Sequence, residues 1–223
     1  LLAADVAEAI AGAAGEVAEG AHDAQFPIDL FQTGSGTSSN MNANEVIATL
    51  ASRALPATVH PNDHVNLGQS SNDVIPTAIQ VAAALLWKQE LRPALLHLRG
   101  VVDRRSRELA KVAKTGRTHL MDAMPLTLGQ ELSAWSAQLS SAIARLDDSA
   151  VRLQQLPLGG TAIGTGINAD RRFGKRAIAR LRATSGVRFA QAGNLFEGIA
   201  AQDAAVEFSG QLNALAVALS KIS

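Results

Sequence analysis

A long run of regularly spaced apolar residues in the second half of the chain restricts the possible folds most strongly. After Pro125, apolar residues recur in a near-heptad rhythm over about four heptads. These residues are Leu128, Leu132, Trp135, Leu139, Ala142, Leu146 and Leu153. At about 1.5 Å per residue, the run predicts a helix of about 40 Å over residues 127–155. Because such a helix buries its apolar face only against partners of similar length, we expect a bundle of long helices.

Helical periodicity also marks most of the remaining chain. It predicts helices over residues 1–21, 41–55, 77–114 with a break at Pro93, 170–184 and 196–222, and it predicts Asp73 as an N-cap. Hydrophobic residues make up 47% of the chain and aromatic residues only 4%; alanine and leucine, which favour helices, dominate the apolar set. No strand-like alternation competes. The sequence therefore predicts an all-α fold, a long-helix bundle, and excludes an all-β or a disordered chain.

Composition and charge exclude several classes of function. The 20 basic side chains balance the 20 acidic ones, which argues against a nucleic-acid partner because such proteins normally carry a basic excess. Basic pairs at 104–105, 171–172 and 175–176 are interpreted as solvated helix faces. No apolar run reaches the roughly eighteen residues of a membrane span. Because the chain has no cysteine, we expect neither a disulfide nor a thiolate zinc site, and a cytoplasmic location.

Three polar segments each immediately precede a predicted helix. They are residues 33–40 (TGSGTSSN), 69–73 (QSSND) and 116–119 (GRTH). Helix N-termini offer free backbone N–H groups and the positive end of the helix dipole, and therefore attract anions. Hydroxyl and carboxamide side chains in the same segments can donate hydrogen bonds to carboxylate oxygens. The pattern predicts a site for a small anion that needs no metal; the alternative is that these side chains only cap helices.

Histidines and glycines supply two further candidates. His119 follows Arg117 and Thr118, and histidine is the usual general acid or base near neutral pH, although a lone loop histidine is often structural. His60 and His64 have the spacing of a metal pair, but Pro61 argues against one continuous helix that presents both. The glycine-rich residues 159–166 lack the lysine and the preceding strand of a phosphate-binding loop, so we exclude that function.

Five motifs together resemble class II fumarate hydratase, a family of the fumarase/aspartase superfamily. They are residues 33–42 (TGSGTSSNMN), 60–63 (HPND), 69–73 (QSSND), 116–119 (GRTH) and 159–166 (GGTAIGTG). The resemblance extends from about residue 22 to the end of the chain. It implies reversible hydration of fumarate to L-malate by a homotetramer whose central helical bundle is pooled from four chains. It also implies that residues 1–69 are the C-terminal portion of a small N-terminal domain and that residues 70–223 begin the bundle domain.

The resemblance further implies a role for each residue that matches a family motif. The predicted substrate-binding residues are Ser35, Gly36, Thr37, Ser70, Ser71, Asn72 and Thr118. The histidine assigned to proton transfer is His119. An accessory anion site is expected at His60, Pro61, Asn62 and Asp63. No cofactor and no metal are implied, and the substrate segments of one site are expected to come from different subunits.

Departures from the family pattern limit what this chain alone is expected to do. The family's mobile serine loop, usually GSSxMPxKxN, is absent, together with the lysine it supplies, an acidic residue after it and the family's opening segment. We therefore expect about half of an enzyme subunit, cut at both ends and inactive by itself. Two alternatives stay open. One is an aspartate ammonia-lyase of the same superfamily, although His119 and residues 33–37 favour the hydratase. The other is a non-catalytic helical fragment that only oligomerises or binds a partner.

Overall fold

The computed structural model describes residues 2–29, 31 and 34–223. The chain forms two compact units, here called unit 1 (residues 1–79 and 155–202) and unit 2 (residues 80–154 and 203–223). The boundary between them falls inside helix α3 (Ser71–Leu86). In the part of the chain that is described, none of the helices combines the length and the apolar character needed to cross a membrane.

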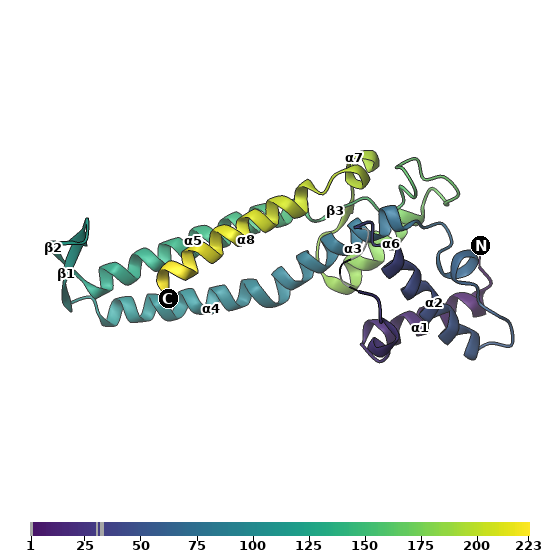
Figure 1. The fold of residues 1–223 in the computed structure, drawn as a ribbon, viewed down its shortest axis with the longest axis horizontal. Helices are drawn as coiled ribbons and strands as arrows, with labels where there is room; N and C mark the ends of the chain where they lie inside the picture. Colours follow the sequence, from purple (N-terminus) through teal and green to yellow (C-terminus); the bar gives the residue numbers. More distant parts are fainter. Residues whose placement is uncertain (1, 30, 32–33) are drawn as a thin grey trace. The chain divides into compact units, whose positions relative to one another are not determined.

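Unit 2 is built from long helices that lie side by side. Its elements are the last part of α3, the π-helical turn η3 (Trp87–Leu91), α4 (Arg92–Glu108), β1 (Ala113–Thr118), β2 (Met121–Thr127), α5 (Leu128–Arg152) and α8 (Asp203–Ile222). Helix α5 packs against both α4 and α8 (Figure 1). Leu139 and Leu146 on its apolar face, and Leu153 directly after its last residue, are fully enclosed. The predicted all-α bundle is therefore confirmed, and the heptad residues form its core.

Local interactions fix where α5 begins and how α3 continues into α4. Thr127 and Gln130 form a capping box: Gln130 N donates to Thr127 Oγ1 at 3.1 Å, and Thr127 N donates to Gln130 Oε1 at 2.9 Å. Pro93 has no N–H to donate along the helix, which accounts for the irregular turn η3 just before it. Asp147 of α5 accepts hydrogen bonds there from Trp87 Nε1 at 3.2 Å and from Arg92 Nε at 2.8 Å.

The β-hairpin between α4 and α5 corrects the sequence prediction. We predicted that a helix would extend to residue 114 and that the chain would contain no strand, but α4 ends at Glu108, and β1 and β2 then pair antiparallel. Gly116 and Pro125 within these strands disfavour a helix. The alternation of a strand was hidden because both faces of the hairpin are largely exposed, so that no apolar side chains mark a buried face.

Unit 1 combines shorter helices around a small apolar core. Its elements are α1 (Ala4–Ala18), η1 (Asp23–Gln25), α2 (Thr37–Arg53), the π-helical turn η2 (Pro61–Val65), the first part of α3, β3 (Gln155–Leu156), α6 (Phe173–Ser185), β4 (Ala190–Gln191) and α7 (Leu195–Ala200). The core residues are Ala13, Ala48, Ala51 and Val59. Helix α2 begins four residues before the predicted start at 41, so that part of the first polar motif is helical.

Asp73 has a different role from the predicted N-cap. It lies inside α3, and its side chain is completely buried. Its Oδ1 accepts a hydrogen bond from Ser70 N at 3.1 Å, whereas its Oδ2 accepts from Gly159 N at 2.9 Å and from Thr161 N at 3.0 Å. One carboxylate thus joins the beginning of α3 to a loop that follows more than eighty residues later.

Burial raises the pKa of the Asp73 carboxyl, and the backbone N–H groups of Gly159, Thr161 and Ser70 offset part of that rise. In the variant Asp73→Asn, one oxygen acceptor becomes an N–H donor facing these groups. We expect its free energy of unfolding near neutral pH to be lower by about 1–3 kcal/mol, as measured by urea unfolding. The exposed Asp23→Asn serves as a control and should change the value by less than about 0.5 kcal/mol.

The difference in the free energy of unfolding between the wild type and Asp73→Asn should also depend on pH. Because the pKa of Asp73 is raised in the folded state, folding is favoured when this group is protonated. The stability of the wild type relative to Asp73→Asn should therefore be greatest below the ordinary aspartate pKa and decrease as the pH rises through the raised pKa. Unfolding curves between about pH 4 and about pH 7 test this, and a constant difference across the range would contradict the assignment.

Candidate functional site

A cavity of about 340 Å³ in unit 1 brings two of the predicted substrate segments together. Ser35 from the first segment and Ser71 and Asn72 from the second line the same space. The complete lining is Gly34, Ser35, Ser71, Asn72, Ile75, Pro76, Ile79, Ile199 and Gln202. None of the described residues that line it carries a charge, so the cavity offers hydroxyl and carboxamide groups beside aliphatic side chains.

The first segment is held against the start of α3 by a close contact and a hydrogen bond. Gly36 has a φ of 68°, and a Cβ atom at this position would lie 2.8 Å from Ile75, so the turn requires glycine. Beyond this turn, the buried Asn40 donates from Nδ2 to Ser71 Oγ at 2.9 Å. The hydroxyls of Ser35 and Thr37 lie 3.1 Å apart. Thr33, the first residue of this motif, lies outside the described residues.

The second segment forms the first turn of α3. The backbone N–H of Asn72 donates to Ser70 Oγ at 3.2 Å, and Asn72 Nδ2 donates to the carbonyl oxygen of Ala162 at 2.8 Å. Ser70 therefore supports the turn, while Ser71 and Asn72 reach the cavity. The hydroxyl of Ser71 and the carboxamide of Asn72 are the polar groups that this turn contributes to the cavity lining.

The glycine-rich residues 159–166 support the second segment. The carboxylate of Asp73 accepts hydrogen bonds from the N–H groups of Gly159 and Thr161. The carbonyl oxygen of Ala162 accepts a hydrogen bond from the side-chain amide of Asn72. Gly164 has a φ of 107°, and a Cβ atom there would lie 2.7 Å from the ring of Phe196. The loop thus resembles a phosphate-binding loop only in composition, because its backbone donors face a carboxylate of the protein.

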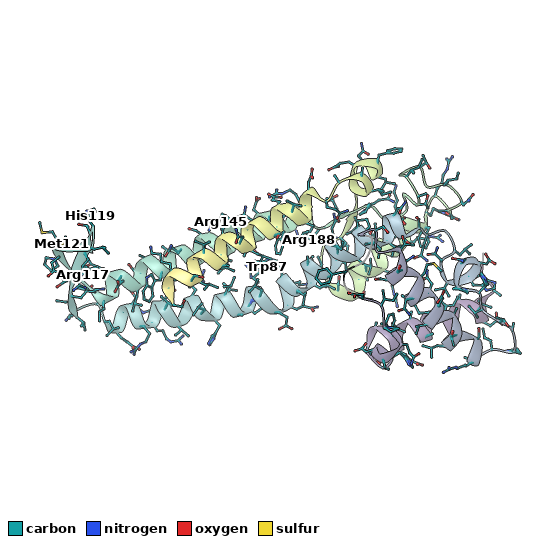
Figure 2. The ribbon with its side chains drawn as sticks, in the orientation of Figure 1. Trp87, Arg117, His119, Met121, Arg145 and Arg188 are labelled. Atoms are coloured by element: carbon teal, nitrogen blue, oxygen red, sulfur yellow. The ribbon has the colours of Figure 1, made fainter. Side chains whose placement is uncertain are left out.

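Thr118 and His119 belong to unit 2, whereas the cavity belongs to unit 1. The motif at 116–119 was predicted to precede a helix directly; this is wrong, because it occupies the end of β1 and the hairpin turn. His119 and Leu120 form a two-residue turn with φ values of 50° and 62°, an uncommon conformation for residues other than glycine. Both are exposed, and Figure 2 shows His119 with Arg117 and Met121 on the hairpin.

The predicted accessory anion site forms the turn η2. The ring nitrogen Nδ1 of His60 accepts from Asn62 N at 3.3 Å and from Asp63 N at 3.2 Å, so His60 caps its own turn. The backbone N–H of His60 donates to Nδ1 of His64 at 2.8 Å. The amide donors of this turn therefore already have an imidazole acceptor, which a bound anion would replace. Across the described residues, no group of three or more potential metal-ligating side chains gathers.

Other shifted pKa values come from ion pairs on the protein surface. Hydrogen bonds from the side chain and from the backbone N–H of Arg172 lower the pKa of Asp170 to about 2. The pKa values of Arg92, Arg152 and Arg172 are raised, in each case first by side-chain hydrogen bonds to neighbouring carboxylates. The shifted group next to the cavity is thus Asp73, which holds the loop and does not line the cavity.

Sequence reasoning missed several residues that shape the cavity. Asn40 and Asp73 belong to two of the recognised motifs. Because these motifs also contain the predicted substrate-binding residues, a supporting role for Asn40 and Asp73 could have been inferred from the sequence. Ile199 and Gln202 come from α7 and the segment after it, more than a hundred residues further along the chain. Nothing in their local sequence distinguishes them from other residues of a helical region.

Comparisons with known proteins agree with the fold and with the motifs. A protein-family model described as Lyase matches residues 1–223. The class II fumarate hydratase of Xylella fastidiosa (strain Temecula1 / ATCC 700964) is 63% identical over 223 residues, which cover 100% of this chain and 47% of that protein. The class II fumarate hydratase of Mycobacterium tuberculosis (strain ATCC 25618 / H37Rv) is 51% identical over 224 residues, with the same coverage of 100% and 47%.

A solved structure leads to the same result. The recombinant class II fumarase from Schistosoma mansoni superposes with a TM-score of 0.93 at 38% identity, over 99% of this chain and 50% of that one. The chain therefore spans about half the length of the relatives it matches. The resemblance indicated by the five motifs is confirmed by these relatives. Because the family model covers every residue from 1 to 223, the chain belongs to the lyase family.

Proposed function

We propose that the chain is part of an enzyme that reversibly hydrates fumarate to L-malate. The observation that carries this proposal is the cavity at which Ser35, Ser71 and Asn72 meet. Its polar groups are neutral hydroxyls and carboxamides, its remaining lining is largely aliphatic, and it lies at the N-terminus of α3. These features suit a short dicarboxylate, whose carboxylates need hydrogen-bond donors and whose carbon chain needs apolar contacts.

The chemistry explains why such a site needs many aimed donors. Removal of a proton from the carbon next to a carboxylate builds extra negative charge on that carboxylate in the transition state. Donors already oriented toward this position stabilise the charge without reorganising, and loss of one donor costs about 3–4 kcal/mol of transition-state stabilisation. The positive end of the α3 dipole adds to this field. We assign carboxylate binding to Ser35, Gly36, Thr37, Ser70, Ser71, Asn72 and Thr118, and the accessory anion site to His60, Pro61, Asn62 and Asp63.

Proton transfer is assigned to His119, acting through a water molecule or by polarising the substrate. This residue stands on the unit 2 hairpin, and the cavity stands in unit 1. We propose that a complete site combines these parts from different chains of a homotetramer, whose central bundle contains residues 70–223. The small N-terminal domain then contains residues 1–69. The similarity to class II fumarate hydratases over the whole chain supports this assignment.

We expect the 223-residue chain to be inactive alone. The completed protein is defined here as this chain extended by the parts of the Xylella fastidiosa relative that the match does not cover. Fumarate consumption by the completed protein should be easily measured by loss of ultraviolet absorbance, whereas the chain alone should stay at background. Turnover by the chain alone at a comparable rate would contradict the expectation. Consumption that requires added ammonia would favour an aspartate ammonia-lyase, and an assembled but inactive completed protein would favour a non-catalytic role.

The role of His119 is testable in the completed protein. Asparagine keeps a polar side chain but removes the titratable ring, so His119→Asn should lower kcat by about 10²–10⁴-fold with a much smaller change in KM. His97→Asn, on an exposed position of α4, is the matched control and should leave both parameters unchanged. A kcat for His119→Asn within a factor of about two of the wild type would refute the assignment.

A further inference from the structure

Gln202 contributes to the cavity although none of the recognised motifs contains it. It stands between α7 and α8, and it lines the cavity together with Ser35, Ser71 and Asn72. Its neighbour in the lining, Ile199, comes from the last turn of α7. The segment that follows α7 therefore supplies one polar group to the lining, and apart from Ile199 the other lining residues come from the first eighty residues.

Gln202 is half-buried. Its oxygen Oε1 is enclosed by protein, and among the described residues it has no hydrogen-bond partner. The two polar atoms of a carboxamide point in different directions, so an oxygen turned into the protein leaves the nitrogen as the polar atom available to the cavity. An amide nitrogen carries two N–H donors and accepts nothing.

The enclosed oxygen is costly for folding. A buried acceptor without a donor destabilises the folded state. A methionine at this position fills nearly the same volume and has no buried acceptor, so packing alone gives no reason for glutamine.

The surroundings indicate what the amide nitrogen binds. The other polar groups of the lining are the hydroxyls of Ser35 and Ser71 and the carboxamide of Asn72, and the rest is mostly aliphatic. A ligand that fits this set has hydrogen-bond acceptors at its ends and a short apolar middle. We propose that Gln202 binds a carboxylate oxygen of a short aliphatic dicarboxylate through Nε2. This inference rests on the proposed function, because it adds one more binding residue to the cavity to which that function is assigned.

Two variants separate binding from packing. Gln202→Met removes the donor and also the enclosed acceptor, whereas Gln202→Glu replaces the donor by a negative charge. In the completed protein, we expect Gln202→Met to raise KM for fumarate about tenfold or more with little change in kcat, since a hydrogen bond to a charged group is lost. Gln202→Glu should raise KM further. Gln211→Met and Gln211→Glu, at a partly buried position on α8 outside the lining, are the matched controls and should leave KM unchanged.

Thermal unfolding distinguishes this role from a structural one. Because Gln202→Met removes an unsatisfied buried acceptor, its midpoint should rise by about 2–4 °C while binding weakens. If Gln202 had only a structural role, Gln202→Met would lower the unfolding midpoint and weaken binding together. An unchanged KM, or a raised KM with a lowered midpoint, would overturn the proposal.

A binding experiment on the completed protein tests Gln202 independently of turnover. The side-chain amide resonance of Gln202 should shift when succinate, a dicarboxylate that cannot be hydrated, is titrated in, whereas that of Gln211 should stay in place. If the completed protein fails to hydrate fumarate but this shift occurs, the proposed function fails and Gln202 binding stands. If hydration occurs but the shift is absent, Gln202 binding fails and the proposed function stands.

Discussion

The buried carboxylate of Asp73 is the interaction on which the candidate site depends. It receives N–H groups from Ser70, Gly159 and Thr161, so backbone dipoles, in place of a cation, offset part of the cost of burying its charge. The loop held in this way presents the carbonyl oxygen of Ala162, which accepts a hydrogen bond from the side-chain amide of Asn72. The orientation of a cavity side chain is thus set by a residue that does not touch the cavity, which gives this part of unit 1 the supporting layer that precise sites require.

The polar groups that line the cavity are neutral, and the cost of an unpaired charge explains why. A lysine or arginine in the lining would add charge that must be paired whenever the cavity is empty, whereas hydroxyls and carboxamides can exchange hydrogen bonds with water at little cost. Ser71 shows how such groups are kept in place: its hydroxyl accepts a hydrogen bond from the buried Asn40 while it still borders the cavity. A balanced overall charge is consistent with a chain that does not rely on a basic patch to hold an anion.

Sequence periodicity predicted the parts of the fold that depend on local pattern. The enclosed Leu139 and Leu146 follow from the heptad rhythm, because a bundle helix must bury one face. The hairpin escaped prediction because its exposed strands bury no face. The site was predictable as far as its motifs extend, which includes Ser71. Asp73 as a link to residues 159–166, and Gln202 as part of the lining, depend on contacts between segments far apart in the sequence, which no local pattern encodes.

The hairpin turn holds two residues in a strained backbone conformation. The pairing of Thr118 with Met121 leaves only His119 and Leu120 for the turn, and both must take positive φ values that cost energy outside glycine. A longer, glycine-containing loop would avoid this cost but would also let the imidazole move. A residue that transfers a proton needs a fixed position more than a relaxed backbone, because reactivity falls steeply with misplacement of the reacting groups. The strained turn is therefore consistent with the role assigned to His119.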